Sequence, residues 1–301
     1  MKTPLLNEDS DCKADTFATE RVAKQQIPLR EVCTLAANHI KAGYDNRVIL
    51  DDINLVIPSN KISVIIGENG CGKSTLLKTL ARLIKPTSGD ILLNGKKIKE
   101  FPGKQLARVL GLLPQSPVVP EGIAVADLVG RGRFPYQTLL KGFSKKDFEA
   151  VQEALEIMGI TDLANRNIDE LSGGQRQRVW IAMALAQQTD ILLLDEPTTF
   201  LDITYQVEIL DLLTDLNRKR GTTIVMVLHD INLSARYADY IFALHKGKLV
   251  SEGHPSKVIT EELIDQVFGL DCSVIKDPVS GSPFIIPKGR HHVNDVQFSV
   301  S

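Results

Sequence analysis

The sequence predicts an α/β fold, in which a mostly parallel β-sheet is covered by helices on both faces. Three apolar segments predict it. "KISVII" (61–66) runs straight into a glycine-rich loop, and "DILLLDEP" (190–197) and "TTIVMVLHD" (222–230) are apolar almost throughout. Near-continuous apolar strands are typical of parallel sheets that are buried on both faces. An amphipathic helix ending at Gly221 separates the last two strands, and this strand–helix–strand order indicates a parallel crossover.

The first half of the chain adds a second kind of sheet. Residues 31–57 indicate two strands around a turn at Gly43–Asn46, and "DILLNGKKI" (90–98) indicates a hairpin with Asn94-Gly95 at its turn. Between these segments, apolar residues recur at helical spacing after the glycine-rich loop, and Pro86 is expected to stop that helix. We therefore expect an antiparallel β subdomain beside the parallel core.

Between about residues 116 and 170 the composition changes to loop-rich segments followed by a helix. Ser144 is expected to cap this helix and Gly159 to end it, with Phe148, Val151, Leu155 and Met158 on one apolar face. We interpret this segment as a helical subdomain inserted into the core. The predicted boundaries are a disordered N-terminal tail (1–28), a main domain containing the insert (29–255), a C-terminal appendage (256–290) and a flexible tail (291–301).

Composition excludes several classes of protein. A net charge of −2 over 301 residues gives no electrostatic footprint for nucleic acid. No apolar run approaches the ~18 residues of a membrane span, and residues 1–20 are too acidic for a signal or transit peptide. The four cysteines (Cys12, Cys33, Cys71 and Cys272) form no CxxC pair, so we expect reduced thiols. The chain is expected to stay in the cytosol unless a partner holds it at a membrane.

"GENGCGKST" (Gly67–Thr75) matches the phosphate-binding loop, in which glycines let backbone N–H groups surround phosphate oxygens. The loop follows a predicted strand and opens a predicted helix, whose N-terminus adds positive potential. Lys73 is expected to reach the β- and γ-phosphates of ATP, and the Ser74 hydroxyl to bind Mg²⁺. This context makes an ATP site far more plausible than a chance glycine turn.

Two adjacent acids, Asp195 and Glu196, end the apolar strand that follows the insert. Carboxylates at the end of a buried strand are costly unless they face a ligand, a metal or water. Asp195 is expected to hold Mg²⁺, in the second shell or through water, and Glu196 to act as the general base that orients the attacking water. Solvent-exposed acids at a strand end are the alternative.

His229 and Gln115 are weaker candidates. A lone histidine at a strand end is more often structural than catalytic, but the carboxyl ends of parallel strands form the ligand-binding edge. We expect His229 to contact the γ-phosphate and to link it to Glu196. Gln115 lies in a Pro-bounded loop after the segment "RVLGLLP", which is little evidence by itself.

"LSGGQRQR" (171–178) predicts a second helix start with Ser172 as its cap, and a helix N-terminus is an anion site. The phosphate loop already surrounds its own phosphates, so this second device is expected to serve a second nucleotide. A head-to-tail pair of chains satisfies this, because each Ser172 loop would close on the ATP of the other chain. A capped helix start without ligand is the alternative.

Together these motifs resemble the ATP-binding cassette (ABC) family over about residues 31–250. The resemblance is carried by the phosphate loop, the signature 171–175, the acidic strand 191–196 and "TTFLD" (198–202), which stand in the family's order. It implies that Tyr44 stacks on adenine, that Gln115 senses Mg²⁺ and a transmembrane partner, and that Asp202 bridges two subunits. Cys71 stands at a variable position of the phosphate loop, where it is expected to confer sensitivity to thiol reagents.

The predicted site therefore has four parts. The catalytic residues are Glu196, His229 and Gln115; the ATP-binding residues are Tyr44, Gly67, Glu68, Asn69, Gly70, Cys71, Gly72, Lys73, Ser74 and Thr75; the residues for the partner's ATP are Ser172, Gly173, Gly174, Gln175 and Asp202; and the Mg²⁺ ligands are Ser74, Gln115 and Asp195.

Three functional classes within the family can be separated. A chromosome-maintenance or repair ATPase needs hundreds of coiled-coil residues between Lys73 and Ser172, and this chain has no room for them. A ribosome-associated protein would carry two cassettes and basic linkers. One cassette with a helical insert resembles the ATP-hydrolysing subunit of a transporter, which implies a homodimer at the cytoplasmic face of a membrane, permease subunits and, indirectly, a substrate-binding protein.

The cargo is suggested by two stretches alone. "LVGRGRFPYQ" (128–137) and "VIKDPVSGSPFIIPKG" (274–289) resemble importers of ferric siderophores, haem and vitamin B12. The siderophore branch fits best, vitamin B12 or haem uptake is the alternative, and an export or non-transport cassette is more distant. Apolar and aromatic residues in the insert (Val118, Val119, Phe134 and Tyr136) are expected to form the permease dock.

Overall fold

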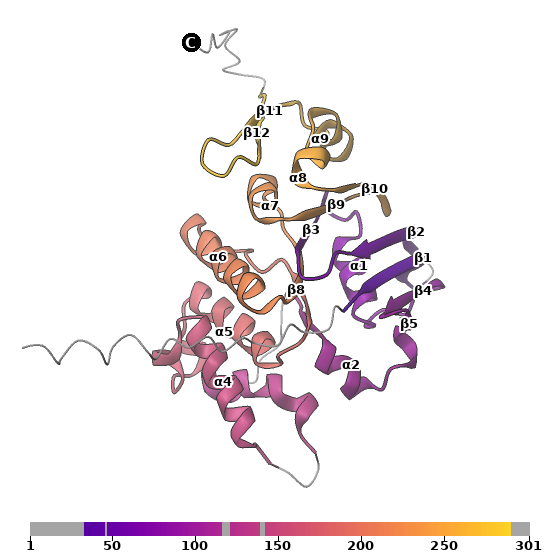
Figure 1. The fold of residues 1–301 in the computed structure, drawn as a ribbon. Coiled ribbons are helices and arrows are strands. Elements are labelled where there is room, and N and C mark those ends of the chain that lie inside the picture. Colours follow the sequence, from indigo (N-terminus) through magenta and orange to yellow (C-terminus); the bar gives the residue numbers. More distant parts are fainter. Residues whose placement is uncertain (1–32, 46, 116–120, 139–141, 290–301) are drawn as a thin grey trace, which may run out of the picture.

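A six-stranded sheet forms the centre of the protein (Figure 1). The computed structural model describes residues 33–45, 47–115, 121–138 and 142–289, so the two predicted tails, Val118 and Val119 lie outside the described residues. The strand order is β10-β9-β3-β8-β7-β6, and all neighbours are parallel except β9 and β10. The strands are β3 (Ile62–Gly67), β6 (Leu110–Leu113), β7 (Ile191–Asp195), β8 (Thr223–Val227), β9 (Tyr240–His245) and β10 (Lys248–Gly253).

Alternating side chains on these strands divide the apolar interior into two clusters. Val64 of β3 and Met226 of β8 point into the first, which contains α5 (Gly173–Ala186) and α6 (Ile203–Arg220). Ile65 and Val225, one residue away on the same strands, point into the second cluster. The second cluster contains α1 (Lys73–Leu80), α2 (Gly103–Val109) and the antiparallel sheet. Burial on both faces explains why these strands are apolar throughout.

The antiparallel sheet has the order β2-β1-β4-β5 and lies beside α1 (Figure 1). Its strands are β1 (Leu35–Tyr44), β2 (Arg47–Ile57), β4 (Ser88–Leu93) and β5 (Lys96–Lys97). Asn94 and Gly95 have φ angles of 51° and 75°, as the predicted tight hairpin turn requires. The prediction of an α/β fold with an antiparallel subdomain is thus confirmed.

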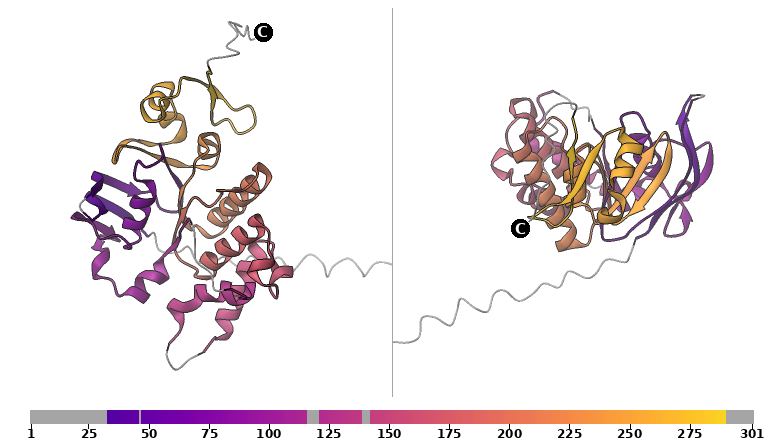
Figure 2. Two further views of the ribbon diagram at one scale, coloured as in Figure 1. Left: turned by 180° about the vertical axis from the view of Figure 1, so that it is seen from behind. Right: turned by 90° about the horizontal axis from the view of Figure 1, so that it is seen from above.

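The insert is helical and packs on α5, away from the antiparallel sheet (Figure 2). Ser144 caps α4 through a capping box with Asp147, and the helix ends just before Gly159, whose φ is 63°. Its elements are α3 (Val125–Gly130), the 3₁₀ helix η2 (Arg131–Tyr136), α4 (Lys145–Ile157), and the 3₁₀ helices η3 (Thr161–Leu163) and η4 (Ile168–Glu170); a further 3₁₀ turn, η1 (Ile98–Glu100), precedes α2.

Two local expectations were wrong. The helix predicted to run to Pro86 ends at Leu80, because the chain turns at Arg82 with a φ of 62° while the Arg82 guanidinium donates to the carbonyls of Ile98 and Phe101. Phe148 of α4 is 63% exposed and packs edge-on against Phe143 instead of joining the core.

The C-terminal elements, two of which pack against α7 (Ile231–Tyr237), lie at the top of Figure 1. They are α8 (Pro255–Val258), α9 (Glu261–Phe268), β11 (Cys272–Lys276) and β12 (Pro283–Pro287). The Asn232 amide binds β12 as a neighbouring strand would, since its Oδ1 accepts from Ile285 N at 2.7 Å and its Nδ2 donates to Ile285 O at 3.3 Å.

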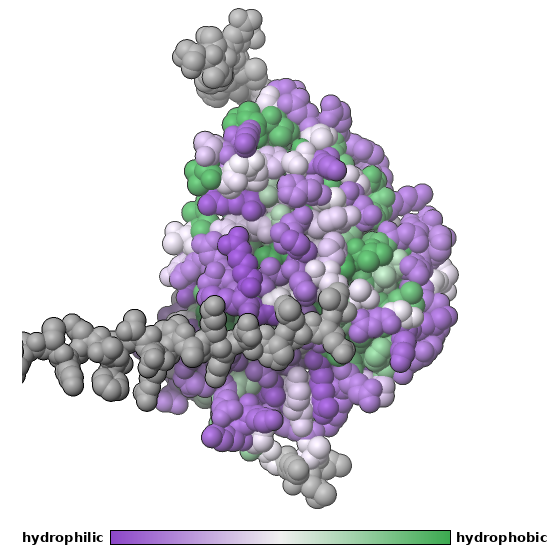
Figure 3. All heavy atoms as spheres, viewed as in Figure 1, coloured by the Kyte–Doolittle hydropathy of each residue, from purple (hydrophilic) through white to green (hydrophobic). Residues whose placement is uncertain are grey.

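Hydrophilic side chains cover most of the face in Figure 3, with small hydrophobic patches, one of them over β11 and β12. The exposed apolar residues of β11, β12 and the turn between them are Ile275, Val279, Phe284 and Ile286. Within the part of the chain that the structure describes, no helix has both the length and the apolarity to cross a bilayer.

Candidate active site

The phosphate loop leaves β3 at Gly67, where only glycine fits. A Cβ there would lie 2.3 Å from the Leu244 carbonyl oxygen and 2.6 Å from Cys71 Sγ. Gly72, with a φ of 111°, turns the chain into α1, and no side chain caps that helix. Its first backbone N–H groups are therefore available to a phosphate, as predicted from the motif.

A cavity of about 340 Å³ lies in front of this loop. Tyr44 is 48% exposed and lines the cavity, and its stacking on adenine stays a prediction. Two lining residues were not predicted: Arg47 and Ile49, on β2 just after Tyr44, whose only sequence signal is their proximity to that aromatic residue. The predicted residues that line it are Tyr44, Asn69, Gly70, Gly72, Lys73, Ser74, Thr75 and Glu196.

Three residues of the predicted ATP set face elsewhere. Gly67 and Cys71 do not line the cavity, and the Glu68 carboxylate lies 3.4 Å from His245 Nδ1. Cys71 is buried, and this burial raises the pKa of its thiol. Because the thiolate is the reactive form, the structure argues against the expected sensitivity to thiol reagents.

Lys73 is buried and donates to the backbone carbonyls of Gly67 at 2.8 Å and Glu68 at 3.0 Å. These contacts satisfy the ammonium group at the place where phosphate oxygens are expected to arrive. Lys73 is therefore held on the loop by its own backbone carbonyls.

Ser74 and Asp195 fit a magnesium ion. The Ser74 hydroxyl donates to Asp195 Oδ1 at 2.8 Å, while Asp195 Oδ2 is buried and has no hydrogen-bond partner among the described residues. Burial raises the pKa of this carboxyl. A buried, unpartnered carboxylate oxygen beside a hydroxyl is a natural place for a hard cation. The third predicted ligand, Gln115, binds Glu196 instead.

The catalytic candidates meet at the carboxyl ends of three neighbouring parallel strands, β6, β7 and β8. Glu196 Oε1 lies 2.7 Å from His229 Nε2, and Gln115 Nε2 donates to Glu196 Oε2 at 2.5 Å. Thr199, which was not predicted, donates its hydroxyl to the same Oε2 at 3.0 Å. The arrangement holds the Glu196 carboxylate at the cavity with both oxygens engaged.

The second predicted anion site lies at the start of α5. Ser172 Oγ accepts from Gln175 N at 3.3 Å, and Gln175 Oε1 accepts from Ser172 N at 3.1 Å. Ser172 and Gly173 are exposed, whereas Gly174 is buried under the Tyr205 ring. Asp202 caps α6 by accepting from Tyr205 N at 3.2 Å. None of these residues lines the cavity in front of the phosphate loop.

Comparison with known proteins agrees with this arrangement. Residues 50–199 match the family model described as ABC transporter. The probable siderophore transport system ATP-binding protein YusV of Bacillus subtilis is 54% identical, over 85% of this chain and 93% of that protein.

Two solved structures are similar in fold. A metal-chelate type ABC transporter in an inward-facing conformation aligns with a TM-score of 0.74 and 29% identity, covering 86% of this chain and 98% of that one. The dimeric, post-hydrolysis structure of the cassette MJ0796 with ADP and phosphate aligns with a TM-score of 0.65 and 30% identity, covering 73% and 98%. With such identity over most of its length, the chain belongs to the ABC transporter family, and the prediction that it is an ATP-binding subunit is confirmed.

Proposed function

We propose that the protein is the ATPase subunit of a ferric-siderophore importer. The observation that carries this proposal is the 54% identity, over 85% of the chain, to an ATP-binding protein of a siderophore transport system. The structural similarity to a metal-chelate type transporter supports the same class of cargo. No residue of this subunit needs to contact the cargo, because the permease and an external binding protein would select it.

The chemistry is ATP hydrolysis at the cavity of the phosphate loop. Lys73 and the free N–H groups of α1 bind and orient the phosphates, and Glu196 accepts a proton from the attacking water. His229, hydrogen-bonded to Glu196 Oε1, orients that carboxylate toward the γ-phosphate. Ser74 and Asp195 would hold Mg²⁺, which when bound neutralises phosphate charge.

A head-to-tail dimer completes each site. The capped start of α5 is exposed and does not line the nucleotide cavity of its own chain, so its uncapped backbone N–H groups suit the nucleotide of another copy. The MJ0796 cassette is dimeric with ADP and phosphate bound, which supports the same assembly here. Asp202, at the exposed start of α6, is proposed to bridge the subunits.

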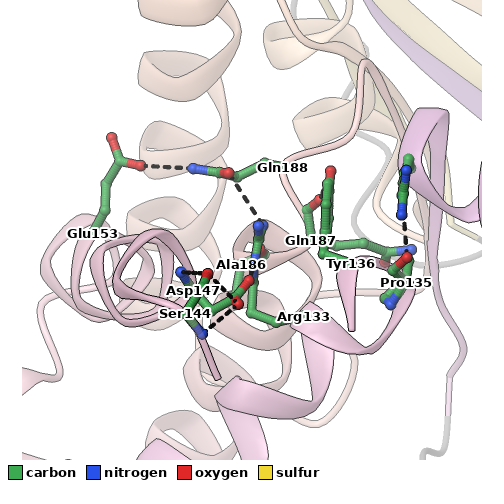
Figure 4. Close-up of polar contacts among 10 residues, drawn as sticks. Arg133, Pro135, Tyr136, Ser144, Asp147, Glu153, Ala186, Gln187 and Gln188 are labelled. Carbon is green, nitrogen blue, oxygen red and sulfur yellow. Dashed lines mark hydrogen bonds and ion pairs between the residues drawn. The ribbon is translucent and has the colours of Figure 1, made fainter. Parts of the chain in front are cut away.

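The insert is proposed to contact the permease, which would place the subunit at the cytoplasmic face of the membrane. Phe134 of η2 is 66% exposed and lies under the Lys104 ammonium, 5.4 Å from the ring centre. Tyr136 was expected to join this surface, but its hydroxyl donates to the Gln187 carbonyl at 2.9 Å and its ring lies against Arg133 (Figure 4). Phe134 is therefore the better docking candidate, and Tyr136 an internal anchor.

Arg133 fixes this surface to the rest of the molecule. Its guanidinium is buried and donates to Asp147 Oδ1 at 2.8 Å and to the Ala186 carbonyl at 2.7 Å (Figure 4). The Ala186 contact holds the last turn of α5, whose first turn carries Ser172. A movement of η2 would therefore be transmitted along α5 to Ser172, which is proposed to contact the partner's nucleotide.

Growth on a single iron source tests the cargo. Deleting the gene should abolish growth on a ferric siderophore while haem and vitamin B12 use remain. Normal growth on the siderophore beside lost haem or vitamin B12 uptake would contradict the proposed cargo.

The Phe134→Ala variant tests the permease contact. Assayed with its permease in liposomes, it should hydrolyse ATP with less cargo moved per ATP. Unchanged coupling of hydrolysis to transport would contradict a role of Phe134 in docking.

A further inference from the structure

The turn between β7 and α6 places the Thr199 hydroxyl against Glu196, the proposed base. Glu196 and Phe200 bracket this turn with φ angles of 55° and 64°, which residues other than glycine rarely adopt. Thr199 N donates to the Glu196 carbonyl at 3.3 Å, which closes the turn. Strained backbone of this kind persists only where the surrounding structure holds it in place.

Two neighbouring helices hold the turn. Gln177 of α5 donates its side-chain amide to the Pro197 carbonyl at 2.8 Å. Gln206 of α6 donates to the carbonyls of Thr198 at 3.3 Å and Leu201 at 3.1 Å. The backbone that carries Thr199 is therefore pinned on both sides, independently of any ligand.

The three donors to the Glu196 carboxylate differ in how they are attached. Gln115 lies 81 positions away in the sequence, in the segment after β6, and His229 is 44% exposed and follows β8. Thr199 belongs to the same short turn as Glu196, and its hydroxyl lies 3.0 Å from Oε2. Of the three bonds, the Thr199 bond alone does not depend on how β6 or β8 is placed relative to β7.

An attacking water has to take a lone-pair position on this carboxylate. Oε2 already accepts two hydrogen bonds and Oε1 one, and the side chain is only 9% exposed. A carboxylate offers about four such positions, so the three donors leave about one, on Oε1, for the water. Thr199, which is confined to the turn, fixes the rotation of the carboxylate and therefore the direction in which this free position points.

We propose that Thr199 is a positioning residue for hydrolysis, whose hydroxyl holds Glu196 Oε2 so that the carboxylate presents a fixed lone pair to the water. This proposal rests on the proposed role of Glu196 as the base. Thr199 does not line the nucleotide cavity, so its effect should appear in turnover and not in ATP binding.

The test compares Thr199→Val, which removes the hydroxyl at nearly constant shape, with Thr199→Ser, which keeps it. Thr199→Val should lower kcat about tenfold to hundredfold, the usual cost of losing a hydrogen bond to a charged group, with KM and Kd for ATP unchanged. Thr199→Ser should restore most of the turnover. Thr199→Ala repeats the comparison without a β-branched side chain in the strained turn.

Thr198→Val is the matched control. Thr198 lies in the same turn and is buried, and its hydroxyl makes no hydrogen bond in the described part of the chain, so turnover should be unchanged. Equal loss in both valine variants, or an equal loss in Thr199→Ser, would show that packing of the turn matters and would overturn the proposal. So would a Thr199→Val enzyme with wild-type kcat, or one with weakened ATP binding.

The Glu196→Gln variant tests separately the role of Thr199 and the role of Glu196 as the base. If Glu196 is the base, Glu196→Gln binds ATP and loses most turnover, and adding Thr199→Val changes its residual single-turnover rate little, because a positioning residue has nothing left to position. A fully active Glu196→Gln enzyme would contradict the base. An inactive one, in which Thr199→Val still adds its full effect, would contradict only the role of Thr199.

Discussion

Two helix starts, those of α1 and α5, use the same electrostatics in opposite ways. The start of α1 has no side-chain cap, is largely buried and faces a cavity of its own chain. The start of α5 is closed by reciprocal hydrogen bonds between Ser172 and Gln175 and is exposed. The first leaves its donors for a ligand, while the second is stable alone and faces outward. A helix start can therefore bind phosphate of its own chain through uncapped N–H groups, or present a capped, exposed surface to the nucleotide of another chain.

The largest effect is expected at α1. Among the described residues, Lys73 carries the only ammonium group that lines the cavity, so Lys73→Ala should lower ATP affinity on the order of 100-fold and hydrolysis should cease. Calorimetric titration of the isolated subunit measures it, with Lys73→Met as a variant of similar length. An ATP affinity within a few-fold of wild type would contradict the role of Lys73 and the start of α1 in phosphate binding.

At α5 the same measurement should give the opposite result. Ser172→Arg should leave ATP affinity of the single chain unchanged and abolish turnover with permease. Mixing Ser172→Arg chains with Lys73→Ala chains should restore activity, since such a pair contains one intact composite site. Activity no higher than that of the separate variants would mean that each chain completes its own site.

A smaller effect concerns stability. Gln175→Ala removes half of the capping box, so the free energy of unfolding should fall by about 1 kcal/mol and Tm by about 2 °C. Thermal unfolding without nucleotide measures the change. No equivalent loss is available at α1, because its start has no side-chain cap to remove. An unchanged Tm would mean that the α5 start is held by packing alone.

The smallest effect is chemical. Burial raises the pKa of Cys71, so at neutral pH its thiolate fraction, and hence its alkylation rate, should lie below that of a free cysteine and should rise with pH. A cysteine placed at exposed Ser172 should react fast in the same assay. In each of the two proteins compared, all cysteines other than the one tested would be replaced by serine. Equal rates at the two positions would remove the contrast between a buried and an outward start.

Local motifs explain how much could be predicted. The phosphate loop, the Ser144 cap and the Asn94-Gly95 turn depend on a few adjacent residues, so their patterns identified them correctly. The Thr199 contact could not be found this way, because a threonine in a turn has no distinctive pattern. The positions of two aromatic residues were predicted wrongly. Phe148 was expected on the apolar face of its helix but is exposed, and Tyr136 was expected on the docking surface but packs against two arginines. The roles assigned to the site residues stay predictions until the variants are measured.

The division of the interior by the six-stranded sheet also bears on how the molecule opens. Amides of β3 and β8 are covered by one apolar cluster on each face, so they should exchange with deuterium only when both clusters open. The outer elements β2 and α9 each contact a single cluster and can open while the other stays closed. Slow exchange should therefore mark the strands that end at the phosphate loop and just before His229, which makes the scaffold of the site the last part of the protein to come apart.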